Sequence, residues 1–214
     1  DWEKTSFSCI KDGLNAKALI SGKYLGIDFT AEIIIQPTGE MTFSYRINGE
    51  SNGWLRESGL KFHLADNFTT LKWERNGYWS YYPDGNFAGN EGMSPLYNKK
   101  KVEYGENPNQ DWNMDTYNYY YFSDKGAICD NPLTNKAKGM KENIYNYILS
   151  NQKTDAVLGV HSDNGELGCR MNKMTDGQLI LYVDNRWDYP EIAWGDYCKE
   201  LEVTPVYGVI KMSL

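Results

Sequence analysis

The residues best suited to bind a ligand lie in a predicted loop at residues 184–196. The loop mixes aromatic, acidic, basic and amide side chains, among them Arg186, Trp187, Asp188 and Trp194. Carboxylates and amides form paired hydrogen bonds to neighbouring hydroxyls, and an indole ring offers a flat apolar face. A pyranose matches both, because its C–H face is apolar and its rim carries hydroxyls. The loop is therefore a candidate sugar site; in the alternative, Trp187 packs beneath the loop and the acids face water.

A second aromatic segment follows a predicted strand at residues 71–73. We expect Asn76-Gly77 to adopt positive φ and residues 83–85 (Pro-Asp-Gly) to turn the chain back. Between these turns lie three exposed candidates for stacking on a sugar: Tyr78, Trp79 and Tyr81. The alternative for any one of these aromatic residues is that it fills the core of a β-sandwich.

Catalysis by two carboxylates is the next possibility, since retaining glycoside hydrolysis needs a nucleophile and an acid/base roughly 5 Å apart. Candidate pairs are Asp111 with Asp115 and Asp188 with Glu191. With 29 acidic residues in the chain, such neighbours arise by chance. We therefore predict that the chain has no catalytic pair of its own.

Composition excludes several other classes of protein. The 214 residues carry a net charge of -7, which argues against nucleic-acid binding. No run of eighteen apolar residues exists, so no membrane span is expected. The four cysteines (Cys9, Cys129, Cys169 and Cys198) form no C-x-x-C pair, which argues against a zinc site and leaves two disulfides or free thiols open.

The strand signals predict an all-β, antiparallel sandwich. The clearest is a hairpin in which residues 29–35 and 41–47 flank the turn Gln36-Pro37-Thr38-Gly39. Further strands are expected at residues 60–64, 71–73, 117–122, 143–149, 157–161, 179–183 and 201–212. Residues 85–112 lack a regular pattern and are expected to form a long loop. Residues 137–142 are the one weak helix candidate.

From residue 29 onward the sequence resembles the C-terminal β-sandwich (small-chain) domain of family 2 glycoside hydrolases of the β-galactosidase type. The resemblance rests on a strand ending in Trp73 that leads through a Gly-containing loop to Tyr82-Pro83-Asp84. Three other stretches agree in order: residues 56–60, residues 104–108 with Asp115, and residues 184–187. The chain departs from the family at Ser80-Tyr81, where the family usually has Glu-Asn, and at Gly85, where it usually has Arg.

The resemblance implies a supersandwich similar to the galactose mutarotase-like fold, with residues 1–214 forming one domain of a longer, periplasmic or extracellular enzyme. The partners implied are a galactoside-like glycan and a separate catalytic barrel that holds both carboxylates. Trp187, then Trp194, would line the sugar site. No cofactor is expected, although the acidic loops leave calcium open.

Three rival functions remain at this stage, one of which is a purely structural domain without a binding role. The first is an independent carbohydrate-binding module that uses Tyr78, Trp79 and Tyr81. The second is an enzyme like the aldose mutarotases, which share this sandwich architecture and use histidine with an acid. The chain has two histidines, His63 and His161, and we expect both to be solvent-facing strand residues.

Overall fold

The computed structural model describes residues 2–24, 26–48, 57–65, 67–78, 80–82, 84–85, 89–96, 140–151, 153–173, 178–187 and 206–214. For six strand residues it describes the backbone alone: Glu57, Asn172, Lys173, Arg186, Trp187 and Val206. Within these ranges every regular element is a β-strand and every pairing is antiparallel. The prediction of an all-β, antiparallel sandwich is confirmed.

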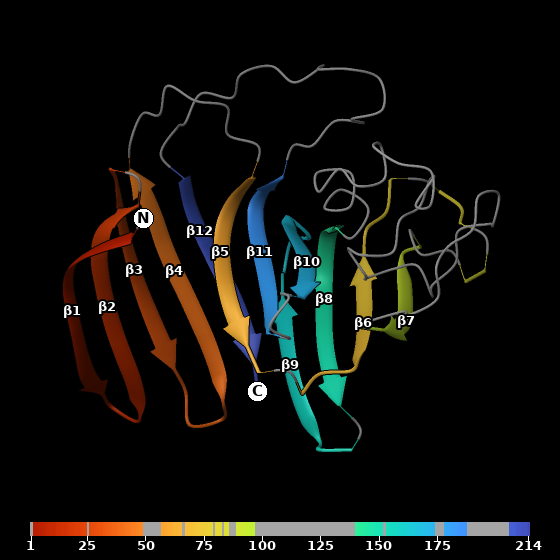
Figure 1. Cartoon of the computed structure of the whole chain (residues 1–214), viewed down its shortest axis with the longest axis horizontal. Helices are drawn as coiled ribbons and strands as arrows, with labels where there is room; N and C mark the ends of the chain where they lie inside the picture. The colour runs from red at the N-terminus through yellow and green to blue at the C-terminus, as the bar shows by residue number, and fades with distance from the viewer. Residues whose placement is uncertain are drawn as a thin grey trace.

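Twelve strands make up the described fold (Figure 1). In chain order they are β1 (Trp2–Asp12), β2 (Asn15–Tyr24), β3 (Ile27–Ile35), β4 (Glu40–Asn48), β5 (Glu57–Leu64), β6 (Thr70–Arg75), β7 (Glu91–Pro95), β8 (Lys141–Asn151), β9 (Ala156–His161), β10 (Leu167–Lys173), β11 (Leu179–Trp187) and β12 (Val206–Ser213). Their order in the sheet is β1-β2-β3-β4-β12-β9-β8-β10-β11-β5, and β6 joins β8 to β7.

The single sheet curls into two layers because β8 pairs with different strands along its length. Its later residues, Asn146–Asn151, pair with β9, whereas Ile144 and Lys141 pair with β10. The strands β9 and β10 follow one another along β8, separated by a turn at residues 162–166. Since β9 continues to β12 and β10 continues to β11, this turn is where the two layers part.

The predicted hairpin at residues 29–47 is confirmed as β3 and β4. Gly39 supplies the positive φ that the turn needs (φ 87°), and its N–H donates to Gln36 O at 3.0 Å. The register pairs Ala31 with Tyr45 and Ile33 with Phe43, so the apolar residues of both strands share one face.

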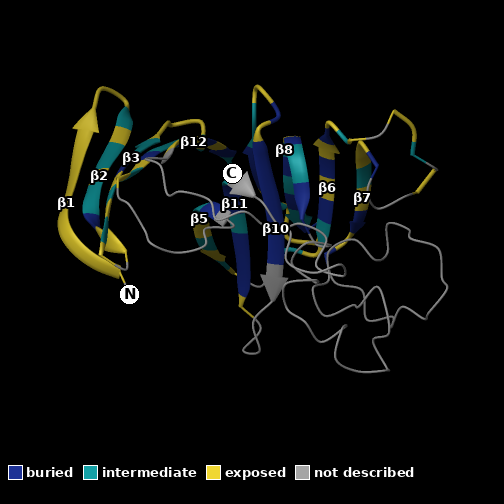
Figure 2. Cartoon of the chain, turned by 90° about the horizontal axis from the view of Figure 1, so that it is seen from above, coloured by how far each residue is buried: buried dark blue, intermediate teal, exposed yellow. Residues whose placement is uncertain are grey.

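The core fills the space between the two layers. Phe62 of β5 meets Phe43 of β4 edge-on, with ring centroids 5.1 Å apart, although these strands are far apart in the sheet order. The predicted apolar face of β5, Leu60, Phe62 and Leu64, packs against this core. At the edge of the sheet that β1 forms, this packing ends: β1 is exposed along its whole length (Figure 2).

Several sequence predictions need correction. Strands β1, β2, β7 and β10 were not predicted, and β7 interrupts the segment at 85–112 that was predicted as a loop. The helix candidate at 137–142 is wrong at Lys141 and Glu142, which begin β8, because cross-strand pairing with β10 outweighs local helix propensity. The predicted strand at 117–122 and residues 201–205 of the last predicted strand lie outside the described residues.

A substitution at Gly208 tests how tightly the core is packed where β12 pairs with β4. A Cβ at this position would lie 2.4 Å from two ring atoms of Tyr45. We expect Gly208→Ala to lower the free energy of unfolding by about 2 kcal/mol, since the buried ring has to shift. Urea unfolding followed by tryptophan fluorescence measures the change, with Val209→Thr on the exposed face of β12 as the matched control. Equal stability of the two variants would contradict this packing.

Candidate functional site

Both aromatic segments that the sequence singled out leave the same end of the sandwich. Arg75, the last residue of β6, pairs with Ile144 of β8, and Ile144 also pairs with Leu167 of β10. The next residue, Gly168, pairs with Asp184 near the end of β11. We call this end of the strands the upper end, as it stands in Figure 1. Two strands, β8 and β10, lie between β6 and β11 there, along the part of the sheet that bends.

A buried tryptophan anchors the segment that follows β6. Trp73 is almost fully buried, and its Nε1–H donates to Gly89 O at 3.1 Å. The ammonium group of Lys141 lies 5.0 Å from the centre of the indole ring, within the range of a cation–π interaction. Burial, and then the charge of Arg75, holds the pKa of Lys141 well below its usual value. These contacts hold the end of β6 in place, where the segment with Tyr78 and Tyr81 begins.

Gly77 sets the path of the loop, but not through positive φ as predicted. The described residues with positive φ do not include Asn76 or Gly77. Glycine is needed there because a Cβ would lie 2.5 Å from both Asn90 Oδ1 and Tyr82 Oη. The Gly77 N–H donates to Asn90 Oδ1 at 2.9 Å, which ties the loop to the residues before β7. The predicted turn at Gly85 does have positive φ, at 72°.

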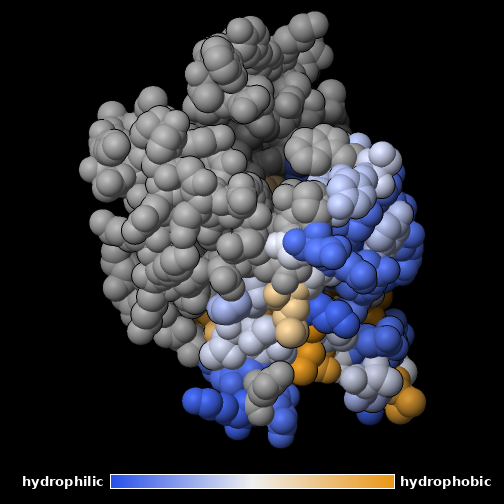
Figure 3. All heavy atoms as spheres, turned by 90° about the vertical axis from the view of Figure 1, so that its right-hand side faces the viewer, coloured by the Kyte–Doolittle hydropathy of each residue, from blue (hydrophilic) through white to orange (hydrophobic). Residues whose placement is uncertain are grey.

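Two tyrosines of this loop present their rings to solvent. Tyr78 is 68% exposed and Tyr81 is 74% exposed. The hydroxyl of Tyr78 donates to Glu142 Oε2 on β8 at 3.0 Å, so its ring is held rather than free to rotate. Partial burial and then the charge of Glu142 raise the pKa of Tyr78. Seen from the side of β6 and β7, the described surface is mostly hydrophilic (Figure 3).

The loop predicted at residues 184–196 begins later than expected. Residues 184–187 belong to β11, where Arg186 pairs with Ser58 and Trp187 with Glu57. Before them Asp184 is buried, and Tyr45 Oη donates to Asn185 Oδ1. Burial and then the charge of Asp184 raise the pKa of Tyr45. The base of this segment is therefore held by the core.

The remaining predicted site residues lie outside what the structure describes. This holds for the side chains of Arg186 and Trp187 and for all of Trp79, Asp188 and Trp194. The same is true of the carboxylates considered above for catalysis: Asp111, Asp115, Asp188 and Glu191. Of the sugar-binding set, the structure therefore places the side chains of Tyr78 and Tyr81, and the backbone of Arg186 and Trp187 at the same end.

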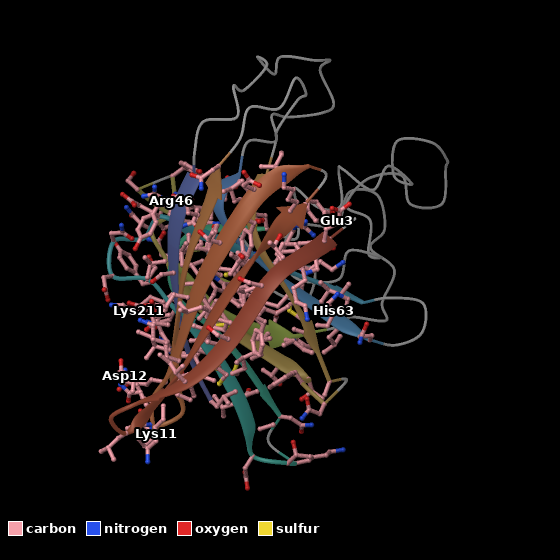
Figure 4. The ribbon with its side chains drawn as sticks, turned by 90° about the vertical axis from the view of Figure 1, so that its left-hand side faces the viewer. Glu3, Lys11, Asp12, Arg46, His63 and Lys211 are labelled. Carbon is pink, nitrogen blue, oxygen red and sulfur yellow. The ribbon has the colours of Figure 1, made fainter. Side chains whose placement is uncertain are left out.

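The two histidines differ from each other. His63 is exposed on the far layer, as expected, and its Nδ1 lies 2.9 Å from Gln178 Oε1 (Figure 4). His161 also lies on the outer face of its strand, but it is half-buried there, and both of its ring nitrogens are hydrogen-bonded, to Asn146 and Ser213. Cross-strand polar partners on β8 and β12 hold this ring, and a strand pattern alone does not indicate them.

The described residues show neither a metal-binding cluster nor a disulfide. Among these residues no group of three His, Cys, Asp or Glu side chains could hold a metal ion. Cys9 is an exposed free thiol and Cys169 a buried one, whereas Cys129 and Cys198 lie outside the described residues. Burial, followed by the charge of Asp184, raises the pKa of Cys169 well above its usual value. No helix in the described part is long and apolar enough to cross a membrane.

Sequence reasoning missed a groove on the outer face of β1, β2, β3, β4 and β12. It has a volume of about 540 Å³. Its lining follows one row across the strands, because Ser6 pairs with Ser21, Ser21 with Thr30, Thr30 with Arg46 and Arg46 with Tyr207. Figure 4 shows Arg46 on this side of the sheet. Its hydroxyl residues come from different strands, so no local pattern in the sequence indicates the groove before the register is known.

Comparison with known proteins adds no family to this description. No family model matches the chain, and no curated protein matches it in sequence. The likeness to the C-terminal domain of family 2 glycoside hydrolases, and to the galactose mutarotase-like fold, stays a prediction.

The contact between Tyr78 and Glu142 can be tested by titration. Removing the negative charge in Glu142→Gln takes away part of what favours the neutral phenol, so the pKa of Tyr78 falls toward its ordinary value. The pKa of Tyr78 stays above its ordinary value, because burial is the largest cause of the rise. Ultraviolet difference titration against Tyr78→Phe isolates this one phenol. An unchanged pKa in Glu142→Gln would show that the two side chains do not meet.

Proposed function

We propose that the chain is a non-catalytic, saccharide-binding β-sandwich domain, the C-terminal domain of a β-galactosidase-like glycoside hydrolase. In this role it contributes aromatic side chains to a sugar site next to a separate catalytic barrel. The observation that carries the proposal is that β6, which leads into the Tyr78–Tyr81 loop, and β11, which leads to Trp187, both end toward the top of the sandwich as Figure 1 shows it.

The exposed rings support saccharide binding at this end. An aromatic ring whose face is open to water gains free energy when it stacks on the apolar face of a pyranose. Tyr78 and Tyr81 are both exposed, while Trp73, which would provide the largest face, is sealed in the core. The hydrogen bond from Tyr78 to Glu142 limits the rotamer freedom that binding would otherwise remove.

The charged groups nearby support a non-catalytic role. Lys141, Arg170 and Asp184 are all buried at this end of the sheet. The guanidinium of Arg170 lies over the ring of Tyr182 at 3.5 Å, and Lys141 lies over Trp73. A buried charge that packs on a core ring cannot reach a sugar bound at the surface. Glu142, which is not buried, is hydrogen-bonded to Tyr78, and in this proposal the two carboxylates of retaining hydrolysis belong to the barrel.

A second candidate function, an independent carbohydrate-binding module, is favoured by the groove on the outer face. Its floor offers the hydroxyls of Ser21, Thr30 and Ser44, and Arg46 and Glu32 supply charged partners for hydroxyl pairs. Tyr207, 63% exposed, stands at one end. Such a groove would bind a glycan without any help from a barrel.

Calorimetric titration of the chain with galactotetraose tests saccharide binding directly. We expect weak, saturable binding that Tyr78→Ala or Tyr81→Ala weakens about fivefold each, the effect of losing one stacking ring. Tyr24→Ala is the matched control, since Tyr24 is similarly exposed at 57% but lies on β2.

The outcome shows which of the two surfaces binds the saccharide. Binding that falls with Tyr78→Ala or Tyr81→Ala supports the upper end, and binding that falls only with Tyr207→Ala supports the outer groove. If the chain binds no saccharide at millimolar concentration, an independent module is excluded. A sugar site that the chain shares with a catalytic barrel is then tested by the next experiment.

A longer protein that contains this chain and a barrel tests the shared site. Trp187→Ala is expected to lower kcat/KM for an aryl galactoside about fivefold, or about 1 kcal/mol, because a stacking face is lost in the transition state. Tyr207→Ala, on the outer face, is the control and leaves the kinetics unchanged. Unchanged kinetics in Trp187→Ala would reduce the domain to a structural role.

A further inference from the structure

A polar network that the proposed function does not use crosses the outer face of β6, β8, β9 and β12. Asn146 Nδ2 donates to Glu74 Oε2 at 2.7 Å, and Asn146 Oδ1 lies 2.8 Å from His161 Nδ1. His161 Nε2 lies 2.8 Å from Ser213 Oγ. The four side chains come from four strands, so the register of the sheet is what brings them together.

The network fixes the protonation of the neutral imidazole. A carboxylate only accepts hydrogen bonds, so Glu74 takes the amide N–H of Asn146 and turns Oδ1 toward His161. That oxygen accepts from Nδ1–H, which leaves Nε2 with its lone pair. Nε2 therefore accepts the hydroxyl proton of Ser213. This is the arrangement in which a histidine acts as general base on a serine.

Gly159 makes room for the pair of side chains. A Cβ at this position would lie 2.6 Å from His161 Nε2 and 2.8 Å from Ser213 Oγ. Any larger residue would push the ring away from the hydroxyl. The contact between His161 and Ser213 thus depends on a glycine in the neighbouring strand position, since Gly159 pairs with Ser213 in the ladder between β9 and β12.

Ser213 and His161 face a hollow of about 430 Å³. Its other lining residues include Gln36, Glu40 and Thr42, which are polar. Met41 and Met212 also border the hollow, but their side chains belong to the core. Lys211 also lines the hollow, and its ammonium group pairs with Asp163 (Figure 4 labels Lys211). The hollow has the size of a small-molecule site.

We propose that Ser213 is a nucleophile and His161 its general base, and that this site hydrolyses short-chain acyl esters. Ser213 Oγ adds to the ester carbonyl carbon while its proton passes to His161 Nε2. The carbon–oxygen bond to the alcohol breaks, and the alcohol leaves with that proton. Water, deprotonated by the same nitrogen, then cleaves the acyl-serine, so that ester and water give acid and alcohol.

The surrounding residues match this substrate class. The small volume of the hollow suits a short acyl chain, and the polar lining suits an alcohol that carries further hydroxyls. Asn146 does not touch the substrate; it is a positioning residue that holds the tautomer of His161. The proposal does not rest on saccharide binding at the upper end.

Labelling with a fluorophosphonate and turnover of p-nitrophenyl acetate test the site. We expect the label on Ser213 in peptide mass spectrometry, with Ser8, an exposed serine of β1, unlabelled. Ser213→Ala should abolish labelling and lower turnover to the level of free imidazole. His161→Gln should lower turnover about 100-fold, since the general base is lost.

The positioning role of Asn146 is tested by a measurement that a general loss of structure would not reproduce. Asn146→Leu is expected to lower kcat with KM unchanged. Asn146→Asp combined with Glu74→Gln, which keeps an oxygen to accept from Nδ1–H and a donor to hold that oxygen in place, is expected to restore most of kcat. The proposal is overturned if Ser213 is not labelled or if Ser213→Ala turns over the ester as fast as the unaltered chain. Ser213→Ala removes a single oxygen, so we expect it to fold normally. A urea unfolding midpoint equal to that of the unaltered chain checks this.

Discussion

The point on which the whole fold depends is the change of partner along β8. Asn143 has positive φ (55°), rare for a residue other than glycine, and the ladders to β6 and β10 both shift register beside it. The bend allows Lys141–Ile144 to pair with one layer and Asn146–Asn151 with the other. Without that bend the strands would form one open sheet with no enclosed core.

The same bend decides where charged and aromatic groups lie. It brings the end of β6, the beginning of β8 and the end of β11 to one end of the sandwich, above a core of closely packed rings and buried charges. Lys141 beside Trp73 and Arg170 beside Tyr182 each lie against an aromatic face, which offsets part of the cost of burying a cation. A rigid base of this kind suits loops that bind a ligand, since positions fixed in advance lose less entropy on binding.

The sequence predicted the strands whose pattern is strong and local. Residues 29–47 alternate around a turn with glycine, and Leu60, Phe62 and Leu64 form a clear apolar face. It did not predict β1, because a strand exposed on both faces has no alternation to detect, or β7, where Gly92 and Pro95 imply a loop although an edge strand tolerates them. The outer groove and the contact of His161 with Ser213 depend on register between distant strands, which no local pattern contains.

The most direct test of the central claim, that the upper end binds a saccharide, is a crystal structure of the chain soaked in galactotetraose. The account predicts a sugar ring stacked on Tyr78 or Tyr81, within reach of Glu142. A saccharide bound only in the groove beside Tyr207, or unaccompanied by any contact with those two tyrosines, would contradict it.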